Sequence, residues 1–209
     1  DCAQLLMASE QFCARDVADF CTFSGHKIGG PQGIGCVFAS AHLHEQMEPM
    51  VRGGGQQNGL RAGTLPTPLV VGLAAAFQNF SCHQTNAERI KLLRSKSSLL
   101  FSEITAHIPH CELNGAQHTG RHPGNLNLYF PNCPGDQLLH AIFSKVAAST
   151  GSACNSGAIE PSYVLQALGH PPERASQSIR LSLSTSTTDE EIVFAARIIS
   201  QAALNVSIS

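Results

Sequence analysis

One lysine stands in a setting that suits covalent chemistry. Three of the four lysines, Lys91, Lys96 and Lys145, lie in stretches with helical character. The fourth, Lys27, lies between the end of an apolar run and a glycine-rich turn, in Ser24-Gly25-His26-Lys27-Ile28-Gly29-Gly30. A lysine partly enclosed at such a turn loses its proton more easily and can form a Schiff base with a carbonyl cofactor. The alternative from the residues alone is a solvated lysine on a surface turn.

One cysteine has a setting unlike the others. Cys154 lies among small polar residues, in Thr150-Gly151-Ser152-Ala153-Cys154-Asn155-Ser156-Gly157, and such a loop leaves a thiol accessible to act as a nucleophile. The chain has eight cysteines, and several of them occupy apolar runs, where cysteine behaves as a small buried hydrophobe. No two cysteines form a C-x-x-C pair. His42 with His44 and His118 with His122 are the closely spaced histidines, but no carboxylate or cysteine completes a ligand set with either pair, so we predict no metal site.

Short strands and a flexible loop are expected to position Lys27. Apolar runs over 19–24 and 33–39 are broken by glycines and predict two strands joined by a tight turn. Residues 52–64 contain five glycines and almost no apolar side chain, which indicates a loop. An Ala- and Leu-rich stretch that follows Pro66 and ends near Phe80 predicts a helix.

Strands and helices alternate over the last hundred residues. The capping-box spacing of Thr85 and Glu88 opens a long predicted helix that ends before Pro109. Alternation predicts strands at 126–130 and 179–183, and Asp136 opens a helix between them with Leu139, Ile142, Phe143 and Val146 on its inner face. A second capping box, Thr188 to Glu191, starts a final helix whose inward residues are Ile192, Ala196, Ile199 and Ala203. The chain is thus of the α/β class.

Composition excludes several classes of protein. Apolar residues make up 43% and charged residues 13%, which excludes a disordered chain. The formal charge is -2 and no basic stripe occurs, so direct nucleic-acid binding is not expected. The longest apolar run, 69–77, is far shorter than the roughly 20 residues of a membrane span. We expect a reducing compartment, the cytoplasm or an organelle with a reducing interior, because the cysteines show no disulfide pattern.

Four motifs in order resemble those of the cysteine desulfurases, the NifS- and IscS-like enzymes of the class-V aminotransferase family. The resemblance extends from residue 1 to about 192. The motifs are Ser24-Gly-His-Lys27 with Gly30-Pro-Gln-Gly-Ile-Gly35, Gly53-Gly-Gly-Gln56 with Leu60-Arg-Ala-Gly-Thr64-Leu-Pro-Thr67, Gly151-Ser-Ala-Cys154 with Glu160-Pro-Ser-Tyr-Val-Leu165, and Ser178-Ile-Arg180.

The resemblance implies roles for individual residues. Lys27 would hold pyridoxal 5'-phosphate and, with His26 beside it, belong to the catalytic set. Cys154 would accept the sulfur of L-cysteine as a persulfide, with L-alanine as the other product, and could serve transiently as an iron–sulfur ligand. Arg180 would bind the substrate carboxylate, consistent with its outward place on a strand. The remaining cofactor contacts would be Asp1 to the ring nitrogen, Gln4 to the ring hydroxyl, Ser24 and His26 to the phosphate, and Thr64 to the phosphate of a partner subunit's cofactor.

The implied fold is that of the PLP-dependent transferases of fold type I, the aspartate aminotransferase type. Residues 1–72 would be the C-terminal part of the large cofactor domain, and residues 73–209 the small C-terminal domain with the cysteine loop. The family chain is about twice this length, so we expect a C-terminal fragment.

The resemblance also implies partners. These are a homodimer and an acceptor of sulfur, such as an iron–sulfur scaffold protein, in iron–sulfur cluster assembly or another sulfur-transfer pathway. Two alternatives stay open: a non-catalytic remnant that serves as a dimerisation module, and a related PLP lyase such as a selenocysteine lyase.

Overall fold

A computed structural model describes residues 1–9, 13–82, 86–116, 120–151 and 161–208 of the chain. The chain forms two compact units, which divide between Ile90 and Lys91. Each unit is described by itself. The expected domain boundary after residue 72 falls inside a helix that is continuous from Thr67 to Cys82. No helix of the described residues is both long and apolar enough to cross a membrane.

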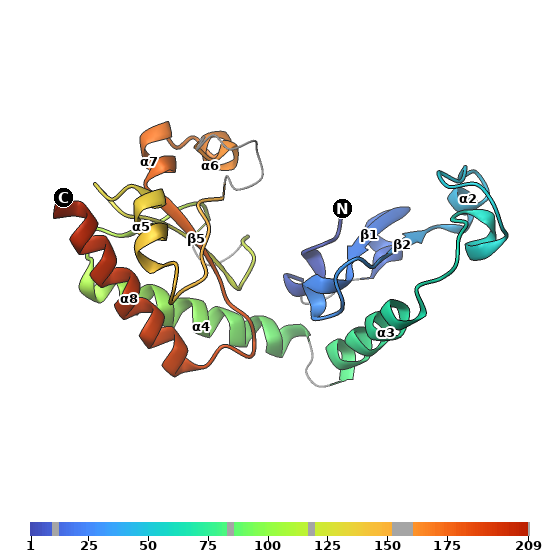
Figure 1. Cartoon of the computed structure of the whole chain (residues 1–209), viewed down its shortest axis with the longest axis horizontal. Helices are drawn as coiled ribbons and strands as arrows, with labels where there is room; N and C mark the ends of the chain where they lie inside the picture. Colours follow the sequence, from blue (N-terminus) through green and yellow to red (C-terminus); the bar gives the residue numbers. More distant parts are fainter. Residues whose placement is uncertain (10–12, 83–85, 117–119, 152–160, 209) are drawn as a thin grey trace. The chain divides into compact units, whose positions relative to one another are not determined.

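The first unit is built on a β-hairpin that matches the two predicted strands. Strand β1 (Phe20–Ser24) pairs antiparallel with β2 (Gly35–Ala39), and Ser24 lies opposite Gly35. Figure 1 shows this hairpin beside helix α3. The remaining elements of the unit are η1 (Leu5–Met7), α1 (Ala14–Val17), η2 (Gly25–Ile28), α2 (Ala41–His44), η3 (Gln56–Gly59) and α3 (Thr67–Cys82).

Two glycines allow the hairpin to close tightly around its turn. A Cβ at Gly35 would collide with the carbonyl oxygen of Phe23 on the facing strand. A Cβ at Gly25 would lie 2.9 Å from the carbonyl oxygen of Ile34 and 3.0 Å from the side chain of Leu73 in α3. Because only glycine lacks a Cβ, these positions let the turn that carries Lys27 pack against the start of β2 and against α3.

The second unit contains a three-stranded antiparallel sheet whose apolar face packs against helices. The strand order is β3 (Glu112–Leu113), β4 (Asn125–Tyr129) and β5 (Ser178–Ser182). The helices are α4 (Asn86–His107), α5 (Gly135–Ile142), α6 (Tyr163–Ala167), α7 (Pro172–Ser176) and α8 (Asp189–Ile208). Figure 1 shows α4, α5 and α8 gathered against the sheet.

The two faces of this sheet differ in character. Leu126 and Leu128 of β4 and Ile179 of β5 face a core that they share with side chains of α4, α5 and α8. The alternate residues, including Asn127 and Arg180, face the other side. The predicted alternation of buried and polar residues is therefore confirmed for both strands.

Helix α5 is shorter than the helix that the apolar spacing predicts. The helix begins at Gly135 and ends at Ile142, and its buried side chains are Leu138 and Ile142. Phe143 is 85% exposed, so its prediction as an inner-face residue is wrong, whereas Leu139 and Val146 are partly buried and pack against the core. Val146 lies beyond the helix end. The regular helix ends at Ile142, although the Val146 N–H still donates to the Ile142 carbonyl at 2.9 Å. Apolar spacing identifies a common face of a helix but not which positions on that face the core covers.

The second predicted capping box is confirmed at the start of α8. The Glu191 backbone N–H donates to Thr188 Oγ1 at 3.2 Å, and the Thr188 N–H donates to Glu191 Oε2 at 2.8 Å. Ile192, Ala196, Ile199 and Ala203 are all buried, as predicted. The first predicted box cannot be compared, because Thr85 lies outside the described residues.

We expect Thr188→Ala to lower the free energy of unfolding by about 1 kcal/mol, because it removes the acceptor of a helix N-terminal N–H. Chemical denaturation of the two proteins measures the difference. Ser102→Ala is the matched control: this exposed hydroxyl bonds only to the carbonyl of Leu99 within α4, so its removal should change stability by less than about 0.5 kcal/mol. Equal effects of the two substitutions would contradict the capping role.

Candidate functional site

Lys27 lies on a short turn at the end of β1. The 3-10 turn η2 is closed by a hydrogen bond of 2.9 Å from the Gly30 N–H to the Gly25 carbonyl, and Gly29 ends it in the left-handed conformation with φ of 84°. Gly25 is buried whereas His26 and Lys27 are exposed. The expected partial enclosure of Lys27 is therefore wrong for this unit, because the turn packs its glycine backbone inward and its lysine outward.

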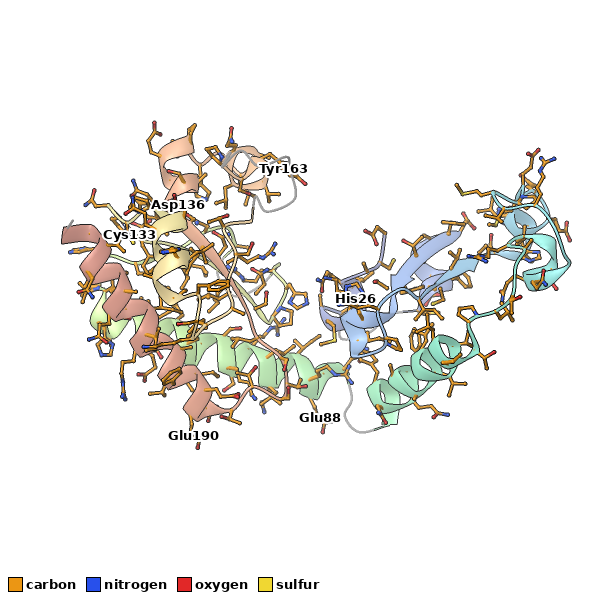
Figure 2. All side chains as sticks on the ribbon, in the orientation of Figure 1. His26, Glu88, Cys133, Asp136, Tyr163 and Glu190 are labelled. Atoms are coloured by element: carbon orange, nitrogen blue, oxygen red, sulfur yellow. The ribbon has the colours of Figure 1, made fainter. Side chains whose placement is uncertain are left out.

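Ser24 and His26 form a pair directly before Lys27. The Ser24 hydroxyl and His26 Nδ1 are hydrogen-bonded at 2.9 Å, so the imidazole is held against the end of the strand. Figure 2 shows His26 on the turn after β1. An imidazole held through Nδ1 keeps Nε2 available for an external partner.

The Asp1 carboxylate is tied to the same strand. Its Oδ1 accepts from the Ala3 backbone N–H at 2.9 Å and from the Thr22 hydroxyl at 3.4 Å. The backbone N–H of the buried Cys2 donates to the Thr22 carbonyl at 2.9 Å, which secures the segment. Thr22 and Ser24 are alternate residues of β1 and so face the same side of the hairpin. The structure thus brings Asp1 to the face of the strand that leads to Ser24.

Gln4 and Thr64 are placed less directly. Gln4 is exposed and precedes η1, and η1 packs against η2. Thr64 is exposed at the end of the glycine loop, where the Gly63 N–H donates to Gln56 Oε1 at 3.3 Å. Within that loop Gln57 and Asn58 take left-handed backbone angles, with φ of 53° and 56°, a conformation that is costly for residues other than glycine.

The group on β1 and η2 fits a cofactor with a pyridinium nitrogen, an aldehyde and a phosphate. The Asp1 carboxylate can pair with a protonated ring nitrogen, and the exposed Lys27 amine can react with an aldehyde. The Ser24 hydroxyl, the His26 imidazole and the nearby turn N–H groups suit a phosphate. These donors and acceptors come from one strand, the turn after it and the segment bonded to it.

Arg180 lies in the second unit, beside Ser149, which precedes Cys154 by five positions in the sequence. The Arg180 and Ser149 backbones exchange two hydrogen bonds, of 3.1 and 2.5 Å. The Gly151 N–H donates to Ser149 Oγ at 3.0 Å, and a Cβ at Gly151 would lie 3.7 Å from Ser162 Oγ. Residues 151 and 162 therefore lie close together next to the arginine, whose side chain is exposed as predicted. Cys154 itself lies outside the described residues.

Several of the other thiols are held in their neutral form. Burial raises the pKa of the Cys21, Cys36 and Cys133 thiols, and burial together with the charge of Glu112 raises the pKa of Cys111 to about 12. The thiolate is the nucleophilic form of cysteine, so the raised pKa makes these four thiols less reactive at neutral pH than a solvated cysteine. Cys21, Cys111 and Cys133 are buried and Cys36 is half-buried, which supports their interpretation as apolar packing residues.

We expect the stability of the second unit to fall as pH rises above about 9, partly through Cys111. The unfolded thiol loses its proton near its ordinary pKa whereas the folded one keeps it until about pH 12, so the unfolded state binds fewer protons in that interval. Denaturation at a series of pH values should show a shallower decline for Cys111→Val than for the parent chain. Parallel declines would contradict the assignment.

The structure also identifies site neighbours that the sequence analysis missed. Thr22 donates a hydrogen bond to Asp1. The sequence feature that could have identified Thr22 is its position two residues before Ser24 on the same predicted strand. Asn127 lies directly opposite Arg180 in the β4–β5 pair and accepts a hydrogen bond of 2.7 Å from Asn114. In the sequence, Asn127 is one of the polar residues of an alternating strand, and nothing there indicates a function. Only the register of the paired strands places it beside Arg180.

Comparisons with known proteins identify the family of the chain. The sequence profile of the aminotransferase class-V family matches residues 1–193. The chain is 42% identical over 182 residues to the cysteine desulfurase IscS of Ehrlichia chaffeensis, covering 87% of this chain and 43% of that protein. It is also 42% identical over 177 residues to a mitosomal cysteine desulfurase of Trachipleistophora hominis, covering 83% and 40% of the two chains.

A solved NifS-like protein shows the same fold at 27% identity and a TM-score of 0.75, covering 88% of this chain and 46% of that one. The chain thus spans less than half the length of the proteins that it matches.

Proposed function

This chain belongs to the class-V aminotransferase family, and from that premise we propose that it carries the lysine, the arginine and the sulfur-accepting cysteine of a cysteine desulfurase. The reaction would convert L-cysteine to L-alanine and leave the sulfur on Cys154 as a persulfide. The observation that carries the proposal is the group on one face of β1: the Asp1 carboxylate bonded to Thr22, the Ser24–His26 pair and the exposed Lys27 next to it.

Class-V cysteine desulfurases depend on pyridoxal phosphate, which withdraws electrons from the substrate when it is bound. In this chain Asp1 would hold the ring nitrogen in its protonated form, and Gln4 would donate to the ring hydroxyl oxygen. Ser24 and His26 would bind the phosphate. The Lys27 amine would hold the cofactor and then move a proton between the substrate Cα and Cβ, with His26 as the neighbouring acid or base.

Arg180 would bind the substrate carboxylate through its planar guanidinium. The Cys154 thiolate would attack the substrate sulfur, so that an S–S bond forms while the bond from substrate sulfur to Cβ breaks. The electron pair of the broken bond stays with the carbon and is protonated, which gives alanine. Support for placing Cys154 near Arg180 comes from the backbone bonds between Arg180 and Ser149 and from the approach of Gly151 to Ser162.

We further infer a homodimer in which Thr64 reaches the phosphate of the partner's cofactor, since Thr64 is exposed at the end of a loop with strained backbone angles. The persulfide would pass to an iron–sulfur scaffold or another sulfur acceptor. A reducing compartment, the cytoplasm or the reducing interior of an organelle, is supported by the free thiols of Cys2, Cys13, Cys21, Cys36, Cys111 and Cys133.

The proposal is tested by supplying the purified chain with pyridoxal phosphate and L-cysteine and measuring alanine and protein persulfide. We expect both products in equal amounts from the parent chain and neither from Cys154→Ser. The matched control is Cys13→Ser, which removes an exposed thiol of the first unit and should leave both products unchanged.

Other outcomes would favour the two alternatives. Absence of both cofactor attachment and alanine would favour a non-catalytic dimerisation module. Alanine release from selenocysteine but not from cysteine, unaffected by Cys154→Ser, would favour a selenocysteine lyase. Full activity of Cys154→Ser on cysteine would show that the desulfurase mechanism is wrong.

A further inference from the structure

Four residues lie in one row across the polar face of the sheet in the second unit. The Asn114 backbone N–H donates to the Asn127 carbonyl at 2.8 Å, Asn127 is the register partner of Arg180, and Arg180 bridges to Ser149. Directly opposed residues of an antiparallel pair have Cβ atoms about 5 Å apart on the same face. The side chains of Asn127 and Arg180 are therefore neighbours.

A hydrogen-bonded relay defines which atom of each amide faces which partner. Arg174 Nε lies 2.7 Å from the side chain of Asn114, and a guanidinium can only donate, so that atom of Asn114 is Oδ1. Asn114 therefore directs Nδ2 to its other partners, Asn127 at 2.7 Å and Ser178 Oγ at 2.9 Å. Because Nδ2 donates, the atom of Asn127 that receives it is Oδ1.

The relay is itself firmly anchored. Arg174 forms an ion pair of 2.6 Å with Glu112, and its guanidinium stacks over the ring of Tyr129. Asn114 is 3% exposed, so its amide has little freedom to turn over. The orientation of the Asn127 amide is thus set from Glu112 and Arg174 through Asn114.

The consequence is a second donor beside Arg180. With Oδ1 engaged, Asn127 is left with Nδ2, which makes no hydrogen bond within the described part of the chain. Arg180 likewise makes no side-chain hydrogen bond or ion pair there, and it too is only a donor. Two neighbouring donors cannot form a hydrogen bond with each other. A carboxylate placed between them can accept a hydrogen bond from both.

We propose that Asn127 Nδ2 donates to the same substrate carboxylate that Arg180 binds, with Asn114 as the positioning residue that keeps Nδ2 turned toward it. The inference rests on the proposed function, in which Arg180 binds the carboxylate of an amino acid. Asn127 would add a neutral donor of defined direction beside the charged guanidinium of Arg180. The pair would restrict the orientation of the carboxylate against the guanidinium.

The test is a titration of the chain with L-alanine, followed by NMR at the side-chain amide of Asn127 and at Arg180 Nε. L-alaninamide, which lacks the carboxylate, is the ligand control. We expect saturable shifts of both signals with L-alanine only. Asn127→Leu removes the donor without adding charge and should weaken binding about 10-fold or more, as expected for a hydrogen bond to a charged group.

A second variant tests the relay. In Asn114→Asp the carboxylate still accepts from Arg174, but it now presents an acceptor to Asn127, whose amide must turn over to donate Nδ2 to it. Oδ1 would then face the ligand carboxylate, and we expect a loss of affinity at least as large as for Asn127→Leu. A purely structural role of Asn114 predicts no such loss in a chain that keeps its amide spectrum.

Asn125→Ser is the matched control, because Asn125 lies on the same face of β4 but pairs with Ser182, and it should bind L-alanine as the parent does. Loss of affinity in Arg180→Gln with none in Asn127→Leu or Asn114→Asp would overturn the inference and leave the proposed function in place. Unchanged affinity in Arg180→Gln would instead overturn the proposed role of Arg180.

Discussion

Lys27→Ala is expected to abolish covalent attachment of pyridoxal phosphate and to reduce alanine formation by at least about 10²- to 10⁴-fold, the range for loss of a positioned acid or base. The residue supplies both the amine for the cofactor aldehyde and the group that moves protons. It is exposed on η2 and makes no described contact that holds the fold, so the variant should keep its structure.

Borohydride reduction followed by peptide mass spectrometry measures this directly. We expect the reduced cofactor on the peptide that contains Lys27 in the parent chain and on no peptide of the variant. Lys91→Ala, which removes an exposed lysine of α4, is the control and should retain attachment at Lys27. Attachment to another lysine, or unchanged attachment in Lys27→Ala, would contradict the assigned role.

Leu128→Ala is expected to destabilise the second unit by about 3 to 5 kcal/mol. Leu128 is fully buried, lies on the central strand and is part of the core shared by the sheet with α4, α5 and α8. Its truncation removes apolar contacts and leaves a cavity. The backbone cannot move in to fill this cavity, because β4 is hydrogen-bonded to a neighbouring strand on each side.

Denaturation monitored in the second unit measures the change. Leu204→Ala is the matched control, since Leu204 lies on α8 and is 49% exposed, and its removal should cost less than about 1 kcal/mol. Similar losses for the two leucines would indicate that the described core does not carry the stability of this unit.

Local patterns in the sequence predicted those helices and strands that depend on residues close in the sequence. The hairpin strands, the long helices and the capping box of Thr188 and Glu191 depend on neighbours within a few residues, and all are present. The end of α5 was predicted wrongly, because the apolar spacing continues past Ile142 whereas the helix does not. Spacing does not record where the backbone leaves a helix.

The chemistry-bearing residues divide in the same way. Lys27, Ser24 and His26 follow one another at a strand end, so the sequence by itself indicated their proximity, and the spaced motifs indicated the family. The sequence could not place Thr22 against Asp1, nor Asn127 between Asn114 and Arg180, because these pairs are 13 to 53 positions apart and meet only in the folded chain.

The sequence alone therefore determined the family, the lysine turn and the faces of the strands, since these follow from residue type and period. Tertiary structure alone decided which polar side chains share a row on the sheet and which atom of each amide is left as a donor. Register and hydrogen-bond direction are properties of paired strands, and one-residue slips in register would turn the same side chains to the opposite face.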